Sequence, residues 1–155
     1  MWPASWRTEP GAPPVKTFTL DVPLATEAPI QLLDVTESVR EVLRASGIRN
    51  GILTVISRHT TAFVNLNEVE PRLQEDMRVW LESFVPKDRD YLHNRDTVDD
   101  RDNAHSHLMG LLLNASETIP VIDGELSLGT WQSILFVEVD GPRPQRKLTV
   151  HVMGS

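Results

Sequence analysis

Four of the five histidines lie in or beside polar segments, where an imidazole can take part in chemistry. His59 follows a β-branched run and His93 lies in a long polar stretch, while His105 and His107 are two residues apart. Neutral imidazole is the commonest metal-ligand side chain, and its proton is the most easily moved near neutral pH. Three converging histidines would leave one coordination position open for substrate or water, as catalytic metal sites require.

Each histidine also has a simpler interpretation as a solvated or hydrogen-bonded side chain. His105 and His107 would share a face in a strand but would point about 200° apart in a helix. If a helix begins at Ala104, only one of the two therefore faces the site. His151 alternates with apolar residues on a terminal strand, and we interpret it as structural or exposed.

The polar segment 86–103 is long and has no periodicity, which is typical of functional or mobile loops. Four acidic residues in its second half alternate with Arg95 and Arg101, and they are Asp96, Asp99, Asp100 and Asp102. They form either a solvated ion-pair cluster or a source of hard oxygen ligands for magnesium, and they can also orient a histidine.

Two arginines flank a turn that Pro142 and Pro144 stiffen. The guanidinium of Arg143 or Arg146 can hold a phosphate through two parallel hydrogen bonds, although arginine at a turn is equally often plain surface. Before them in the sequence, Trp131 is either a buried core residue or a flat ring on which a ligand can stack.

Hydrophobic periodicity predicts the elements that must position these residues. We expect helices near 35–46, 72–84 and 104–113, with Asn114 as a left-handed stop of the third. The buried side of the second helix should carry Leu73, Met77, Trp80, Leu81 and Phe84. Strands are expected at 15–22, 30–33, 52–59 continuing extended to 66, 117–122, 125–128, 133–139 and 147–153. Helices that interrupt many strands without regular alternation indicate an α+β fold, a layered β-sandwich-like single domain with two to three helices.

The composition limits the function classes. The 155 residues suit one domain at 15–155 behind a proline-rich arm at 1–14. A net charge of −7 argues against nucleic-acid binding, and no apolar run is long enough to span a membrane. The N-terminus lacks the layout of a signal peptide, so we expect a cytoplasmic protein. Because cysteine is absent, any metal must use histidine, carboxylate or water.

Several ordered motifs from about residue 15 to the C-terminus resemble the YjbQ-type secondary thiamine-phosphate synthase family. The specific part is Ser-Glu-Thr-Ile-Pro-Val at 116–121 followed by Gly-Thr-Trp-Gln at 129–132. Further matching segments are 59–62, 67–68, 76–77, 91–94, 103–108 and 141–143.

The resemblance implies a homotrimer that binds a small phosphorylated metabolite and forms thiamine phosphate weakly from a pyrimidine diphosphate and a thiazole phosphate. It places a divalent metal, zinc or magnesium, on His59, His93 and His107. Residues carried over as catalytic are His59, His107, Arg143 and Arg146. Residues carried over as substrate-binding are Asn67, Glu68, Thr130 and Gln132.

Three hypotheses follow. The first is a metal-assisted transferase with weak synthase activity, in which Mg²⁺ and arginine neutralise the departing pyrophosphate. The second is a metal-dependent hydrolase of a small phosphorylated metabolite. The third is a non-catalytic protein that binds such a metabolite. Joining the two substrates needs no base, so the synthase reaction leaves the histidines unexplained and the main activity open.

Overall fold

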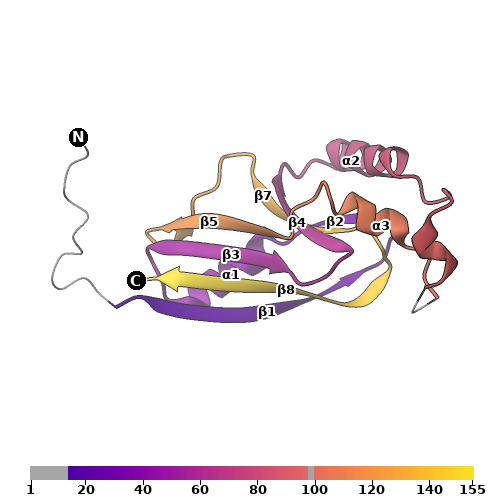
Figure 1. Ribbon diagram of the computed structural model, residues 1–155. Coiled ribbons are helices and arrows are strands. Elements are labelled where there is room, and N and C mark those ends of the chain that lie inside the picture. Colours follow the sequence, from indigo (N-terminus) through magenta and orange to yellow (C-terminus); the bar gives the residue numbers. More distant parts are fainter. Residues whose placement is uncertain (1–13, 98–99) are drawn as a thin grey trace, which may run out of the picture.

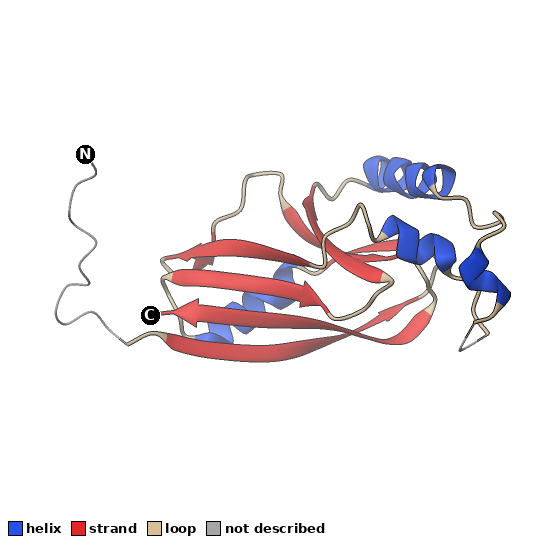
Figure 2. Cartoon of the chain, viewed as in Figure 1, coloured by secondary structure: helices blue, strands red, loops and turns tan. Residues whose placement is uncertain are grey.

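Two antiparallel sheets form the frame of the protein in a computed structural model that describes residues 14–97 and 100–155 (Figures 1 and 2). The larger sheet has the strand order β1-β8-β3-β5-β6 and the smaller has the order β2-β7-β4. The strands are β1 Lys16–Thr26, β2 Gln31–Asp34, β3 Gly51–Ser57, β4 Ala62–Asn67, β5 Ser116–Ile122, β6 Glu125–Leu126, β7 Ser133–Glu138 and β8 Arg143–Gly154. The helices are α1 Thr36–Ser46, α2 Pro71–Phe84, the 3₁₀ turn η1 Leu92–Arg95 and α3 Ala104–Met109.

One hydrophobic core lies between the inner face of the larger sheet, the smaller sheet and α1. Leu53 and Val55 of β3 and Val150 of β8 are fully buried there, and Val39 contributes from α1. The outer face of the larger sheet carries threonines and other polar residues together with exposed Ile52, Ile122 and Met153, and on it Thr19 Oγ1 lies 2.7 Å from Nδ1 of His151. The alternation of apolar and polar residues in these strands therefore follows the two faces of the sheet.

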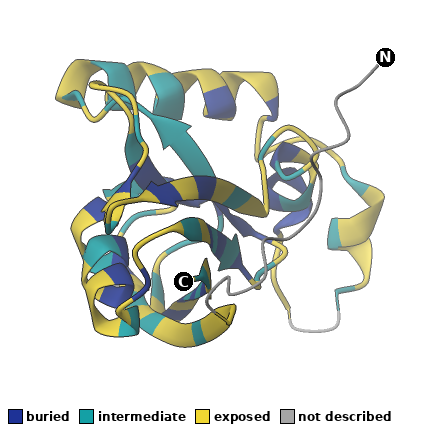
Figure 3. Ribbon diagram, turned by 90° about the vertical axis from the view of Figure 1, so that its left-hand side faces the viewer, coloured by how far each residue is buried: buried dark blue, intermediate teal, exposed yellow. Residues whose placement is uncertain are grey.

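A second core lies on the other face of the smaller sheet. Ile134 and Phe136 of β7 point into the first core, whereas Leu135 and Val137 join Leu81 of α2 in the second. Strand β7 is therefore buried on both faces, which explains its continuous apolar sequence. The exposed residues lie on the outer sides of the layers (Figure 3).

The α+β layered fold predicted from the sequence is confirmed. The arm at 1–14 lies outside the described residues except for Pro14, as does Asp99. The chain does not continue extended from β3 to residue 66, because residues 58–61 cross from the larger sheet to the smaller one. This crossing carries His59 and Thr61 away from the β3 face and toward α3.

Two helix predictions need correction. Helix α3 ends at Met109 and not near residue 113, and residues 110–112 continue as turns in which the amides of Leu111 and Leu112 donate to the carbonyls of Leu108 and Met109. Gly110 packs so closely on Phe63 that a Cβ would lie 2.4 Å from its ring. Asn114 is not a left-handed stop, and it pairs with Val64 through an isolated bridge. On α2 only Leu81 is buried.

The expected buried face of α2 is wrong at its two aromatic residues. Trp80 and Phe84 are 53% and 57% exposed, and their rings stack with centroids 5.3 Å apart. The second core contacts α2 through Leu81 and Val85 at its C-terminal end. Leu73 and Met77 are half-buried. The stripe of α2 that reaches the core is thus narrower than its hydrophobic pattern suggested.

Candidate functional site

A polar cavity of about 450 Å³ opens where the β3–β4 loop, the β7–β8 turn, η1 and α3 meet. Residues far apart in the sequence come together here because the loops of both sheets end on the same side (Figure 1). The lining residues are Arg58, His59, Thr60, Thr61, His93, Arg101, Asn103, His107, Asp140 and Arg146.

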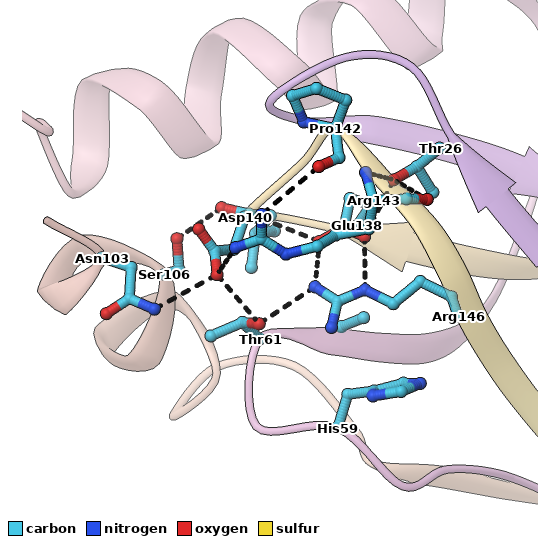
Figure 4. A network of polar contacts seen from close by, with 12 residues as sticks. Thr26, His59, Thr61, Asn103, Ser106, Glu138, Asp140, Pro142, Arg143 and Arg146 are labelled. Carbon is cyan, nitrogen blue, oxygen red and sulfur yellow. Dashed lines mark hydrogen bonds and ion pairs between the residues drawn. The ribbon is translucent and has the colours of Figure 1, made fainter. Parts of the chain in front are cut away.

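The buried salt bridge between Glu138 and Arg146 forms one wall of the cavity (Figure 4). Arg146 Nε and Nη2 donate to the two carboxylate oxygens of Glu138 at 2.7 and 2.6 Å. Nη2 also donates to Oγ1 of Thr61 at 3.1 Å. The Glu138 side chain is fully buried and the Arg146 side chain is 8% exposed. The guanidinium is therefore held in one orientation, with Nη1 left over from these bonds.

Asp140 anchors the polar groups beside this salt bridge (Figure 4). Its Oδ2 accepts hydrogen bonds from Arg143 Nη2 at 2.6 Å, from Asn103 Nδ2 at 3.1 Å and from Thr61 Oγ1 at 3.4 Å. The Asp140 backbone N–H donates to Glu138 at 2.9 Å. One carboxylate thus ties the β3–β4 loop, the start of α3 and the β7–β8 turn together.

His59 is held as a neutral imidazole. Its Nε2 accepts a hydrogen bond of 3.1 Å from the backbone N–H of Lys147. Burial lowers the pKa of His59, and the nearby charge of Arg146 lowers it further. Because Nε2 accepts, the proton of the neutral ring lies on Nδ1. His59 therefore presents one N–H donor for a ligand oxygen.

His93 and His107 lie together on another side of the cavity. Their ring centroids are 5.1 Å apart at an interplanar angle of 83°, which is an edge-to-face arrangement. His93 lies in η1 and His107 in α3, so their contact joins the long polar segment 86–103 to the helix. These rings separate the polar cavity from a neighbouring apolar one.

His59, His93 and His107 line one cavity without forming an assembled three-ligand metal group. Nε2 of His59 is already used by the Lys147 amide. Across residues 14–97 and 100–155, no group of three histidine, aspartate or glutamate side chains is placed to hold an ion. The metal centre on His59, His93 and His107 stays a prediction.

Four residues predicted for the site meet in the cavity, and the others do not. His59, His93, His107 and Arg146 line it, and Arg143 lies behind it on Asp140. Asn67 is the last residue of β4 and Glu68 follows it, and Asn67 Nδ2 donates to Asn65 Oδ1. Thr130 and Gln132 lie in the β6–β7 loop, where Gln132 accepts from the Gly129 amide. Their substrate-binding role is untested in this single chain.

His105 faces away from the cavity. It is 7% exposed, its Nε2 lies 3.2 Å from Ser106 Oγ, and it borders a separate hollow with Lys87. Burial lowers the pKa of His105, and Lys87 lowers it further. As the helical geometry requires, only one of His105 and His107 reaches the site.

The sequence reasoning did not identify Glu138, Asp140, Asn103 or Arg58 as site residues. A signal for two of them is present, because Glu138 and Asp140 alternate with Val139 at the end of an apolar strand. A carboxylate in such a strand is buried and needs a basic partner.

A family model described as "UPF0047 protein YjbQ-like" matches residues 21–155. A UPF0047 protein of Methanothermobacter thermautotrophicus is 49% identical over 91% of this chain and 95% of its own length. The chain belongs to the UPF0047 family of YjbQ-like proteins. Another member, from Archaeoglobus fulgidus, is 39% identical over 82% of this chain and 95% of its own length.

Solved structures of the UPF0047 family share the fold. A YjbQ-like protein of unknown function from Sulfolobus solfataricus superposes with a TM-score of 0.85 at 38% identity, covering 91% of this chain and 99% of its own. A hypothetical protein from Aeropyrum pernix gives 0.82 at 43% identity over 89% and 99% of the two chains. Among the described residues, no helix has the length and apolar character needed to cross a membrane.

Proposed function

We propose that this UPF0047 member is an enzyme that acts on a small phosphorylated metabolite, whose phosphate binds between Arg146 and His59. The observation that carries the proposal is the orientation of Arg146. Glu138 and Thr61 use Nε and Nη2, and Nη1 lies on the side of the guanidinium that faces His59 (Figure 4). A donor that is already fixed loses little side-chain entropy when an anion binds.

The charges around the cavity favour an anion. Glu138 balances Arg146 and Arg143 balances Asp140, with distances of 2.6 Å in both pairs. Arg58 adds positive charge at the cavity rim. The N–H donor of His59 supplies a short-range contact to a phosphate oxygen without adding charge. Fixed donors of this kind stabilise a departing phosphate or pyrophosphate.

The finer form of the proposal is a transferase with weak thiamine-phosphate synthase activity, which the motif resemblance implies. The thiazole nitrogen would form a bond to the pyrimidine methylene carbon. The carbon–oxygen bond to the diphosphate would break, and its electron pair would leave with pyrophosphate. Arg146 and His59 would stabilise that anion, and no base is needed because the thiazole nitrogen carries no proton.

Calorimetric titration of the full chain with inorganic phosphate and pyrophosphate tests the anion site. Arg146→Lys keeps the charge but loses the planar fork, so we expect affinity to fall by about tenfold or more. Arg72→Lys is the matched control, because the Arg72 side chain is 94% exposed on α2. His59→Ala is a second variant. It leaves the Glu138–Arg146 salt bridge intact, so a loss of anion binding in this variant does not come from a broken salt bridge. Failure of the parent protein to bind either anion would overturn the proposal.

Incubation with the two synthase substrates and Mg²⁺ tests the finer proposal. Product should form with the parent protein and fall with Arg146→Lys and with His107→Ala. Phosphate binding without product above the His107→Ala background would remove the synthase activity and keep the anion site.

Metal-assisted hydrolysis is the second candidate, and the adjacency of His93 and His107 favours it. Two neighbouring imidazoles are suitable zinc ligands, and a bound metal would supply a nucleophilic water. Metal analysis of protein purified without chelator measures occupancy. A metal-free protein whose thermal stability does not change on adding zinc would contradict this candidate.

The homotrimer implied by the resemblance is also a proposal. Sedimentation equilibrium should give three times the chain mass of 17.5 kDa. A mass equal to that of one chain at micromolar concentration would contradict it.

A further inference from the structure

A second cavity of about 390 Å³ adjoins the polar one and has a different character. It is lined by Tyr91, Leu92, His93, Ala104, His107 and Leu108. Leu92 and Leu108 are 77% and 40% exposed, so their side chains are open to a ligand. Within residues 14–97 and 100–155, no lysine, arginine, aspartate or glutamate lines this cavity. We call it the apolar cavity.

The two cavities share a wall. His93 and His107 line both of them, and the two rings pack edge to face. A molecule bound in the polar cavity therefore has to pass only this pair of rings to reach Leu92 and Leu108. Imidazole rings have a polar edge and an apolar face, so they suit the junction between a phosphate and a hydrocarbon group.

We propose that the apolar cavity binds the organic part of the substrate, and that the substrate is a phosphate ester of an apolar, ring-sized group. The inference rests on the proposed function, because the polar cavity must hold the phosphate. Leu92 and Leu108 are then the residues that set specificity for the organic group. Neither residue contacts the phosphate side of the site, since neither lines the polar cavity.

Size and energy agree with this assignment. The apolar cavity is open to solvent on one side, and its volume of about 390 Å³ leaves room for a ring with substituents against Leu92 and Leu108. Removing an aromatic ring from water on contact with two leucines should improve binding by roughly tenfold over phosphate alone. A polar ester of similar reach gains no such contribution, because it gives up hydrogen bonds to water in the same place.

The test compares three ligands on the full chain by calorimetry: inorganic phosphate, glycerol phosphate and phenyl phosphate. Phenyl phosphate should bind about tenfold more tightly than the other two. The double substitution Leu92→Gln and Leu108→Asn should remove that preference and leave the affinity for inorganic phosphate unchanged. Leu111→Gln is the matched control, because Leu111 is 81% exposed just beyond α3 and lines neither cavity.

The possible failures are distinguishable. If inorganic phosphate binds and phenyl phosphate binds no more tightly, the apolar cavity does not hold the organic group and this inference is wrong, while the anion site stands. A preference for phenyl phosphate that survives the double substitution also overturns it. If none of the three ligands binds, the proposed function fails and this inference fails with it.

Discussion

Glu138 and Arg146 join the two sheets of the protein, since Glu138 ends β7 of the smaller sheet and Arg146 lies on β8 of the larger one. Their salt bridge is buried, and the carboxylate also accepts from Thr26 at 3.1 Å and from the Asp140 amide. The same pair therefore holds the sheets together and fixes the cation of the candidate site.

Glu138→Gln should destabilise the fold strongly. It leaves the charge of Arg146 buried without a counterion, which costs about 3–5 kcal/mol in comparable pairs. Urea denaturation measures the loss. The double variant Glu138→Met with Arg146→Leu should recover most of the stability and still bind no phosphate. A double variant as unstable as Glu138→Gln would show that the polar network itself is needed for folding.

Stability should fall as the pH is lowered through the range in which histidine titrates. Burial lowers the folded-state pKa of His59 and His105, whereas the unfolded values lie near 6.5. Below about pH 6.5 the unfolded chain binds protons that the folded one refuses, so protonation favours unfolding. The stabilisation is fully present above the unfolded pKa and is lost as pH falls through the lowered pKa. Denaturation curves between about pH 8 and about pH 5 measure it.

His105→Gln separates the two contributions to this pH dependence. Glutamine can still donate to Ser106, and it does not titrate. The slope of stability against pH should become shallower in this variant, with His59 responsible for what is left. An unchanged slope would mean that His105 does not contribute.

Gly141→Ala should destabilise the turn that carries Asp140. A Cβ at Gly141 would lie 2.0 Å from the carbonyl oxygen of Ala28, which is backbone and cannot rotate away. We expect a loss of about 1–3 kcal/mol and a lower melting temperature. Gly129→Ala is the control, because its nearest neighbour is the flexible Gln132 side chain at 3.3 Å. Equal melting temperatures for the two variants would contradict the prediction.

Neighbouring residues of α2 should differ sharply in their contribution to stability. Leu81→Ala opens a cavity in the second core and should cost about 2–5 kcal/mol. Trp80→Ala removes a half-exposed ring that stacks on Phe84, and about 1 kcal/mol is expected. Thermal denaturation of the two variants gives the comparison. A larger loss for Trp80→Ala would contradict the packing described for α2.

Local patterns in the sequence predict much of the fold. Periodicity correctly placed α1, α2 and most strands, because each buries a regular set of side chains. Three errors arose where tertiary packing decides. Helix α3 ends at Met109, where Gly110 packs against Phe63, the second core meets only a narrow stripe of α2, and the 58–61 loop changes sheets. None of these contacts can be predicted from the hydrophobic pattern of the local sequence.

The candidate site was predictable only in part, for a related reason. Residue type singled out four histidines and two arginines, and the family resemblance narrowed the histidines to His59, His93 and His107. The structure places these three and Arg146 on one cavity. The carboxylates that orient the arginines were missed, because a buried acid is recognised by its partner across the sheets and not by its neighbours in the chain. Asn103 reaches Asp140 by a long-range contact of the same kind.

Strand β7 belongs to both hydrophobic cores, with alternate side chains in each. Neither core can lose its packing while β7 stays in place for the other, so the two halves are expected to melt in one cooperative transition. A fragment cut on either side of the strand would carry one bare apolar face. The site built at the end of β7 therefore exists only in the fully folded chain.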